Sequence, residues 1–248
     1  MRHRLFRFFI ITLGLLILWQ GIVWATQLPK FILPGPWLVF ETMIERRELI
    51  VEHAGVTLLE IVLGMIVGCG LGFISALLLQ VIKPIRPWLL PILVVSQAIP
   101  VFALAPILMI WFGYGLTSKI VMASLIIFFP VTSACYDGLR QTPQDWLDLA
   151  TTMQADKWRQ LWHIRLPAAL PSLASGLRVA ATVAPIGAVI GEWVGSSAGL
   201  GYIMLQSNAR MQVDVMFACL LVLAFMALLL YFGIDVFLRR KMPWVQHR

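Results

Sequence analysis

Charged residues are scarce in this chain. Asp, Glu, Lys and Arg together make up 12% of its residues, about half of their usual share in soluble domains. Hydrophobic residues make up 60%, and the mean hydropathy is +0.88. So few charges cannot cover the surface of a water-soluble domain, which excludes that class. A membrane protein with several spans is the class that remains.

Cysteine pairs and catalytic motifs are missing as well. Cys69, Cys135 and Cys219 lie far apart and form no C-x-x-C pair, which excludes a disulfide framework and a cysteine zinc site. The sequence contains no GxxxxGK[ST] phosphate loop, no HExxH and no GxSxG. We therefore expect no catalytic residue, no metal and no cofactor in this chain.

Long apolar runs are what the sequence does contain. Stretches of about 20 mostly apolar residues are typical of transmembrane helices. Six such runs occur, at roughly 6–25, 55–79, 88–112, 118–136, 173–194 and 215–238. Because the runs and their connections use up nearly the whole chain, we predict an all-α polytopic protein with about six spans in one membrane domain, residues 1–248. The basic start also suits a signal peptide, but the first run is longer than a usual signal core, so we expect it to be retained.

The distribution of basic residues predicts the orientation. Of the 19 Lys and Arg residues, the predicted topology places five on one side of the membrane, which are Lys30, Arg46, Arg47, Lys119 and Arg210. The other 14 lie on the side of the two termini. By the positive-inside rule both termini are cytoplasmic, and so is the loop at about 140–167. The net charge of +7 then reflects loops that face anionic lipid and not nucleic acid.

The 140–167 loop is polar, and it is longer than a simple connection needs to be. Thr142 before Pro143 predicts a helix start, and Asp156 is expected to cap a second short helix that ends near Pro167 and Pro171. Apolar residues recur in both segments at helical spacing. They are Trp146, Leu149, Ala150 and Met153, and then Trp158, Leu161 and Trp162. Such stripes can lie on lipid headgroups or dock into a partner's groove, and spacing alone does not choose between these.

The loop contains Asp148-Leu149-Ala150, Ala155, Ile164-Arg165-Leu166-Pro167 and Pro171. This pattern resembles the EAA loop of inner-membrane permeases of binding-protein-dependent ABC importers. The family usually has Glu in place of Asp148 and Gly in place of Gln154, and a Gly would suit a left-handed turn between the helices. In that family the loop is the coupling helix that docks on the ATPase subunit. The residues to which the resemblance assigns this role are Trp146, Asp148, Leu149, Ala150, Met153, Gln154, Ala155, Trp158, Leu166 and Pro167.

The resemblance also implies an architecture and partners. We expect the type I ABC importer permease fold, in the bacterial inner membrane, with a second permease copy forming a homodimer. ATP hydrolysis is expected on a separate cytoplasmic ATPase subunit, and the solute is expected to arrive on an external solute-binding protein.

Two further stretches are "QAIPVFALAPILMIWFGYG" at 97–115 and "GEWVGSSAGLGYIM" at 191–204. Both resemble the nitrate, sulfonate and taurine branch of these permeases. The second stretch, with the following "NARMQVDVMFA", resembles permeases for pyrimidine precursors of thiamine. The resemblance implies a hydroxymethylpyrimidine or aminopyrimidine passenger, with a sulfonate, taurine or nitrate as the competitor. An ion-coupled secondary transporter is the alternative from another class, and it would be expected to bury several acids or histidines at mid-membrane.

Four residues are candidates for the translocation path. Pro100 interrupts the third run just after Ser96 and Gln97, which predicts either a simple kink or a broken helix lining a cavity. The Gln97 amide offers donors and acceptors to a polar passenger. Glu192, near the outer end of the fifth run, is either a loop acid in solvent or part of the outer mouth of the path.

Glycines recur every four residues in two of the runs. This spacing favours close approach of helix backbones, and we expect these glycines to serve helix packing. They are Gly64, Gly68 and Gly72 in the second run, and Gly187, Gly191, Gly195 and Gly199 at the end of the fifth.

Overall fold

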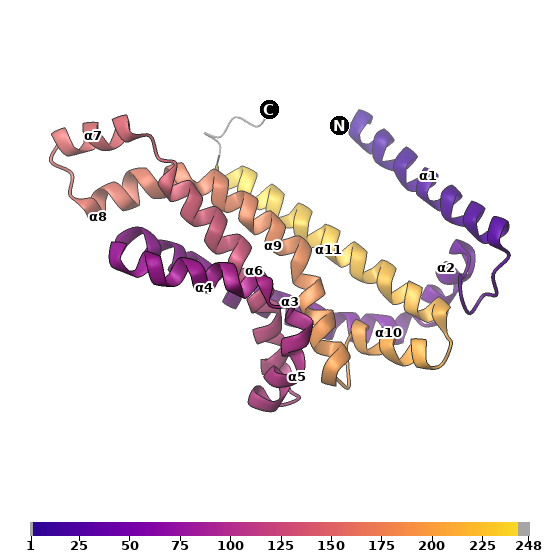
Figure 1. Ribbon diagram of the computed structural model, residues 1–248. Helices are drawn as coiled ribbons and strands as arrows, with labels where there is room; N and C mark the ends of the chain where they lie inside the picture. The colour runs from indigo at the N-terminus through magenta and orange to yellow at the C-terminus, as the bar shows by residue number, and fades with distance from the viewer. Residues whose placement is uncertain (1, 243–248) are drawn as a thin grey trace.

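The computed structural model describes residues 2–242, while the side chains of residues 2–5, 7–9 and 97 lie outside that description (Figure 1). Within it the chain is helical, without a β-strand. Four apolar helical segments are long enough to cross a membrane. They are α3 (Arg47–Val81), α6 (Leu116–Arg140), α11 (Val213–Lys241), and the segment Lys157–Gly195, which joins α8 (Lys157–Gln160), η2 (Leu161–Arg165) and α9 (Leu166–Gly195).

The remaining two predicted spans take other forms. The first corresponds to α1 (Arg2–Thr26), whose described apolar part is Ile10–Thr26. The third is split into α4 (Arg86–Ala98), which follows η1 (Lys83–Ile85), and α5 (Val101–Phe112), and the two parts are bent by 103°. The simple kink considered for this run is therefore wrong. The break lies at Ile99 and Pro100, which are extended, while Pro91 and Pro106 lie within the helices.

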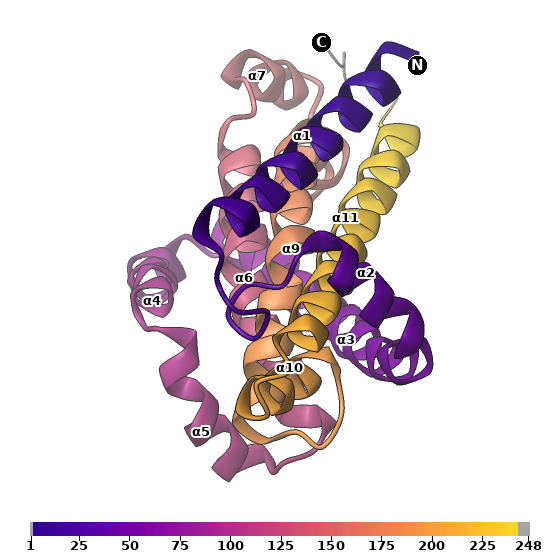
Figure 2. The same ribbon diagram turned by 90° about the vertical axis from the view of Figure 1, so that its right-hand side faces the viewer.

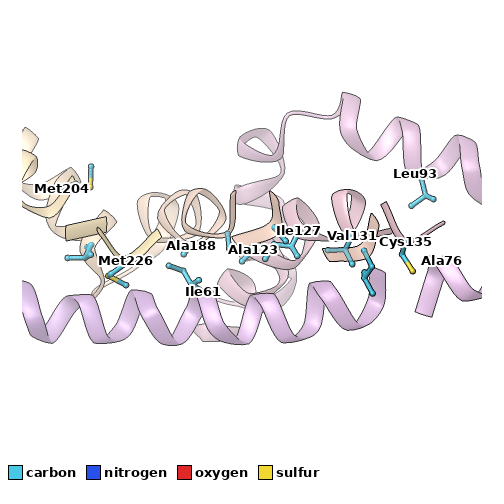
Figure 3. Close-up of a cluster of buried hydrophobic side chains, with 14 of the residues drawn as sticks. Ile61, Ala76, Leu93, Ala123, Ile127, Val131, Cys135, Ala188, Met204 and Met226 are labelled. Carbon is cyan, nitrogen blue, oxygen red and sulfur yellow. The ribbon is translucent and has the colours of Figure 1, made fainter. Parts of the chain in front are cut away.

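Helix α6 lies between α3 and α9 and forms the centre of the core. Ala123, Ile127, Val131 and Cys135 lie along it fully buried, with Ile61 of α3 nearby (Figure 3). Since these side chains are apolar and closely packed, they hold the three long helices together.

Glycines let α3 and α9 approach α6 closely. A Cβ on Gly64 would lie 2.5 Å from the Cβ of Ala123, and one on Gly187 would lie 2.6 Å from the Cα of the same alanine. Gly68 and Gly72 lie in the same way against Ile127 and Val131. No larger residue fits these points unless the backbones move apart.

The last three glycines of the second series have other surroundings. Gly191 lies against Lys119, and Gly195 lies beside Met109 and Tyr114 at the end of α5. Gly199 follows the end of α9 with a φ of 109° and faces the Glu192 carboxyl, so it belongs to a turn and not to a helix pair.

The molecule has two distinct ends. In both views α7 (Gln144–Thr152), the start of α1 and the end of α11 lie at the top, whereas α5 and α10 (Leu200–Ala209) lie at the bottom (Figures 1 and 2). We call these the α7 end and the α10 end. Both ends of the described chain lie on the same side as the 140–167 loop.

Candidate functional site

The start of α7 differs by one residue from the expected cap. Pro143 is the N-cap, and α7 begins at Gln144. The hydroxyl of Thr142 is buried and donates to the Leu139 carbonyl at 3.2 Å, so it closes the end of α6 and does not cap α7. The Gln144 amide donates to Asp148 at 2.9 Å along the exposed side of α7.

A left-handed turn connects α7 to α8. Gln154 has a φ of 58°, and the Ala155 N–H donates to the Ala150 carbonyl at 2.9 Å. This is the usual way to end a helix, with a non-glycine residue at the left-handed position. Asp156 then accepts the Arg159 N–H at 2.7 Å, which confirms it as the cap of α8.

The predicted stripe of α7 is divided between two faces. Trp146, Leu149 and Met153 are 54%, 62% and 75% exposed. Ala150 is buried, as is Leu147, so the four residues predicted as one stripe do not share one exposed face. The reason is that α7 carries apolar residues on two sides, and helical spacing alone does not tell which side is buried.

A cavity of about 760 Å³ opens beside the exposed face. Trp146 and Leu149 line it from α7, and His163, Ile164 and Pro167 line it from the following segment. Exposed apolar side chains around an open hollow are typical of a protein-binding surface.

The second arm of the loop runs into α9 without a break. η2 is one π-helical turn, after which Leu166 and Pro167 occupy the first turn of α9. Because Pro167 lies at the start of α9 and Pro171 lies inside it, the expected stop at these two prolines was wrong. Trp158 and Trp162 pack edge to face, with ring centroids 5.7 Å apart, at the surface of this arm.

The path candidates of the third run lie at the α4–α5 break. The Ser96 hydroxyl donates to the Leu93 carbonyl at 2.7 Å, and exposed Pro100 precedes α5 as its N-cap. The side chain of Gln97 lies outside the described residues. No hydrogen bond or ion pair among the described side chains joins these residues to Glu192.

Glu192 is not a loop acid in solvent, because its side chain is fully buried. Its Oε1 accepts the Thr57 hydroxyl at 2.6 Å, and its Oε2 accepts the Gly201 N–H. Thr57 in turn accepts the Leu200 N–H at 2.8 Å. Through these hydrogen bonds the Glu192 carboxyl group and Thr57 connect the start of α10 to α3.

Two buried charged residues that sequence analysis missed complete this site. Glu60 of α3 is inaccessible to solvent, and its Oε1 lies 2.9 Å from the Lys119 Nζ of α6. Lys119 also donates to the Ser196 hydroxyl at 2.6 Å. A single acid inside an apolar run was the signal for Glu60. We call Glu60, Lys119 and Glu192 the charged cluster.

The turn between α9 and α10 is bound to the same cluster. The Gly199 N–H donates to His53 Nδ1 at 2.9 Å, and the His53 ring stacks on Tyr202 with centroids 6.1 Å apart. A Cβ at Gly199 would overlap the Glu192 carboxyl. The α10 end is thus closed by polar contacts among α3, α6, α9 and this turn.

Comparison with known proteins decides the family. Residues 60–246 match the family described as binding-protein-dependent transport system inner membrane component. The chain belongs to this family. It is therefore the permease subunit of an ABC importer, an integral membrane protein, and not itself an enzyme. ATP hydrolysis takes place on a separate ATPase subunit, and the importer also uses a solute-binding protein.

Individual relatives agree with this assignment. The permease is 58% identical to a probable ABC transporter permease protein of Haemophilus influenzae, over 100% of this chain and 98% of that protein. It is 34% identical to the formylaminopyrimidine transport permease ThiX of Halalkalibacterium halodurans, over 94% and 93% of the two chains. Its fold matches a chain of the MetNI methionine ABC transporter with a TM-score of 0.70 at 22% identity, covering 79% of this chain and 97% of that one. The type I importer permease fold expected from the sequence is confirmed.

Proposed function

We propose that this permease passes a small neutral nitrogen heterocycle, and specifically an aminopyrimidine precursor of thiamine. The similarity to the formylaminopyrimidine permease carries this proposal. A riboflavin transport permease of Chloroflexus aurantiacus is also 34% identical, and riboflavin too is a nitrogen heterocycle. Permeases named for aliphatic sulfonates and for taurine have lower sequence identity to this chain, at 29% and 28%.

The pairing of the charges in α6 and α9 speaks against a cation site for an anionic passenger. A sulfonate would be bound by a free cation or a helix N-terminus. Apart from Arg140 at the end of α6, the cations of α6 and α9 are Lys119 and Arg178. Lys119 is paired with Glu60, and Arg178 donates to Asp235 at 2.7 Å. Neither is free to hold an anion.

We also propose that the exposed face of α7 is where the ATPase subunit docks. Trp146, Leu149 and Met153 present apolar surface at the α7 end, where the described chain both begins and ends. An amphipathic helix of this kind fits a groove on a partner. With the orientation given by the basic residues, this end faces the cytoplasm, and the α10 end faces the external solute-binding protein. A second permease copy would complete the path near the α4–α5 break.

A growth experiment tests the passenger. In a strain unable to make the thiamine pyrimidine, deletion of this permease should raise the external aminopyrimidine concentration required for growth. Expression of the wild-type chain should restore the lower requirement, and growth on sulfonates as the sulfur source should be unaffected in both strains. An unchanged pyrimidine requirement together with lost growth on sulfonates would assign the permease to the competing solute.

A further inference from the structure

Basic side chains from separate elements converge on one cavity at the α7 end. The cavity has a volume of about 820 Å³ and lies where the end of α3, η1 and α4 meet the end of α6 and the α8–η2 arm. Five cations line it, which are Lys83, Arg86, Arg140, Lys157 and Arg165.

No acid among the described residues balances these cations. The cavity lining contains no Asp or Glu, and the described ion pairs all involve Glu60 or Asp235 instead. Arg86 donates to the carbonyls of Leu79 at 2.6 Å and Gln80 at 3.2 Å. Arg165 donates to the Leu139 carbonyl at 3.4 Å. These bonds hold the guanidinium groups in place without neutralising them.

Two of the arginines contact the same aromatic ring. The guanidinium carbons of Arg86 and Arg140 lie 5.8 Å and 5.6 Å from the centre of the Tyr136 ring. Both arginines line the same cavity as three further cations, and a bound anion would offset the repulsion among them. The cavity is therefore suited to an anionic group.

An apolar groove joins the basic cavity. It has a volume of about 250 Å³ and shares Val81, Ile82, Trp158 and Leu161 with the cavity. Its other lining residues are Ile74, Leu77, Leu78 and Trp162. Ile74 and Val81 are 54% and 52% exposed on a helix long enough to span the membrane, so the groove runs along the face that α3 offers to lipid.

We propose that the cavity and the groove together bind one anionic phospholipid, with the phosphate among the cations and an acyl chain along α3. Basic pockets between transmembrane helices are suited to anionic headgroups, and tryptophans favour the headgroup level. A soluble phosphate compound would leave the groove empty. The cavity beside α7 shares no lining residue with this one, so the lipid site is separate from the proposed ATPase surface. A lipid there joins the end of α3 to the second arm of the 140–167 loop.

Native mass spectrometry of the purified full-length chain in detergent tests the proposal. The probes are phosphatidylglycerol, phosphatidylcholine and glycerol phosphate, which has the charged headgroup without chains. The test variant combines Lys83→Gln, Arg140→Gln and Lys157→Gln, because these side chains carry no hydrogen bond that holds the fold. The control combines Arg159→Gln, Arg240→Gln and Lys241→Gln, which removes three exposed charges outside the cavity.

The test variant should bind phosphatidylglycerol about a hundredfold more weakly, if each cation contributes about 1 kcal/mol. The control should bind it like the wild type, and Leu78→Trp, which fills the groove, should weaken phosphatidylglycerol but not glycerol phosphate. Wild-type chain should prefer phosphatidylglycerol to phosphatidylcholine. If the control variant binds phosphatidylglycerol as weakly as the test variant, the effect comes from general surface charge, and the proposed site is wrong. Glycerol phosphate binding as tightly as the lipid would assign the cavity to a soluble phosphate compound instead.

Discussion

The two ends of the permease differ in how their charged side chains are placed. At the α10 end Glu60, Lys119 and Glu192 are buried, and each contacts a protein partner. At the α7 end five cations line one cavity without an acid, and apolar side chains of α7 remain exposed. The α10 end keeps its buried charges in contact with groups of the same chain, whereas the α7 end leaves cations and apolar surface available to other molecules. We therefore expect changes at the α10 end to affect folding, and changes at the α7 end to affect binding.

The largest effect on stability should come from Lys119→Met. Removal of this cation leaves Glu60 buried without its partner, and breaking a buried pair costs about 3–5 kcal/mol. Thermal unfolding of the purified protein should show the loss. Lys83→Met at the exposed α7 end is the matched control and should cost less than about 1 kcal/mol. If both variants unfold alike, the charged cluster does not hold the α10 end together. The second change Glu60→Gln should recover part of the loss, because it removes the unpaired charge.

Gly64→Ala should have the next largest effect on stability, because it adds a methyl group where α3 and α6 are in contact. Its Cβ would lie 2.5 Å from that of Ala123, and overpacking of this kind costs about 1–3 kcal/mol. Gly70→Ala, on the same helix with open space around it, should be neutral or slightly stabilising. The pair Gly64→Ala with Ala123→Gly should unfold close to the wild-type temperature. If Gly70→Ala is destabilising as well, α3 tolerates no alanine at its glycines whatever their surroundings, which would contradict the packing explanation.

Asp156→Ala should have a smaller effect, confined to the second arm of the loop. The carboxylate caps α8 through the Arg159 N–H, and loss of such a cap costs about 1 kcal/mol. Amide exchange should quicken in α8 and η2 while α7 is unchanged. Asp156→Asn keeps an acceptor oxygen and should behave like the wild type. Faster exchange across the whole loop would show that the two arms do not fold independently.

The smallest effect should be a gain in stability from Gln154→Gly. Gln154 has a φ of 58°, which costs a side-chain-bearing residue free energy and costs glycine little. We expect about 0.5–1 kcal/mol of stabilisation in thermal unfolding. Thr151→Gly, inside α7, should instead destabilise by about 1 kcal/mol. A loss of stability in Gln154→Gly would mean that the side chain has a role that outweighs the turn.

The fold could be predicted from the sequence wherever apolar length decides the structure. Runs of about 20 apolar residues correspond to α3, α6, α9 and α11, because a helix in lipid satisfies its own backbone. The break at Pro100 was foreseen as one of two possibilities. Its angle was not, because Pro91 and Pro106 stay within helices and local sequence does not distinguish the three prolines.

The sites were less predictable, because they depend on contacts between distant residues. Helical spacing grouped Ala150 with Leu149, but only packing shows that the first is buried and the second exposed. The Glu60–Lys119 pair joins two helices whose register cannot be derived from one sequence. Asp156 was predictable, because a cap depends on residues three positions apart.

Copurification of the ATPase subunit tests most directly whether the α7 end is the binding end. Leu149→Glu with Met153→Glu places two acids on the exposed face of α7, and Leu205→Glu with Met211→Glu makes the same change on exposed residues at the α10 end. When each permease is coexpressed with the ATPase subunit and purified, the α7 variant should lose the ATPase while it unfolds at the wild-type temperature. The α10 variant should retain it. Retention of the ATPase by the α7 variant, or equal loss from both, would contradict the account.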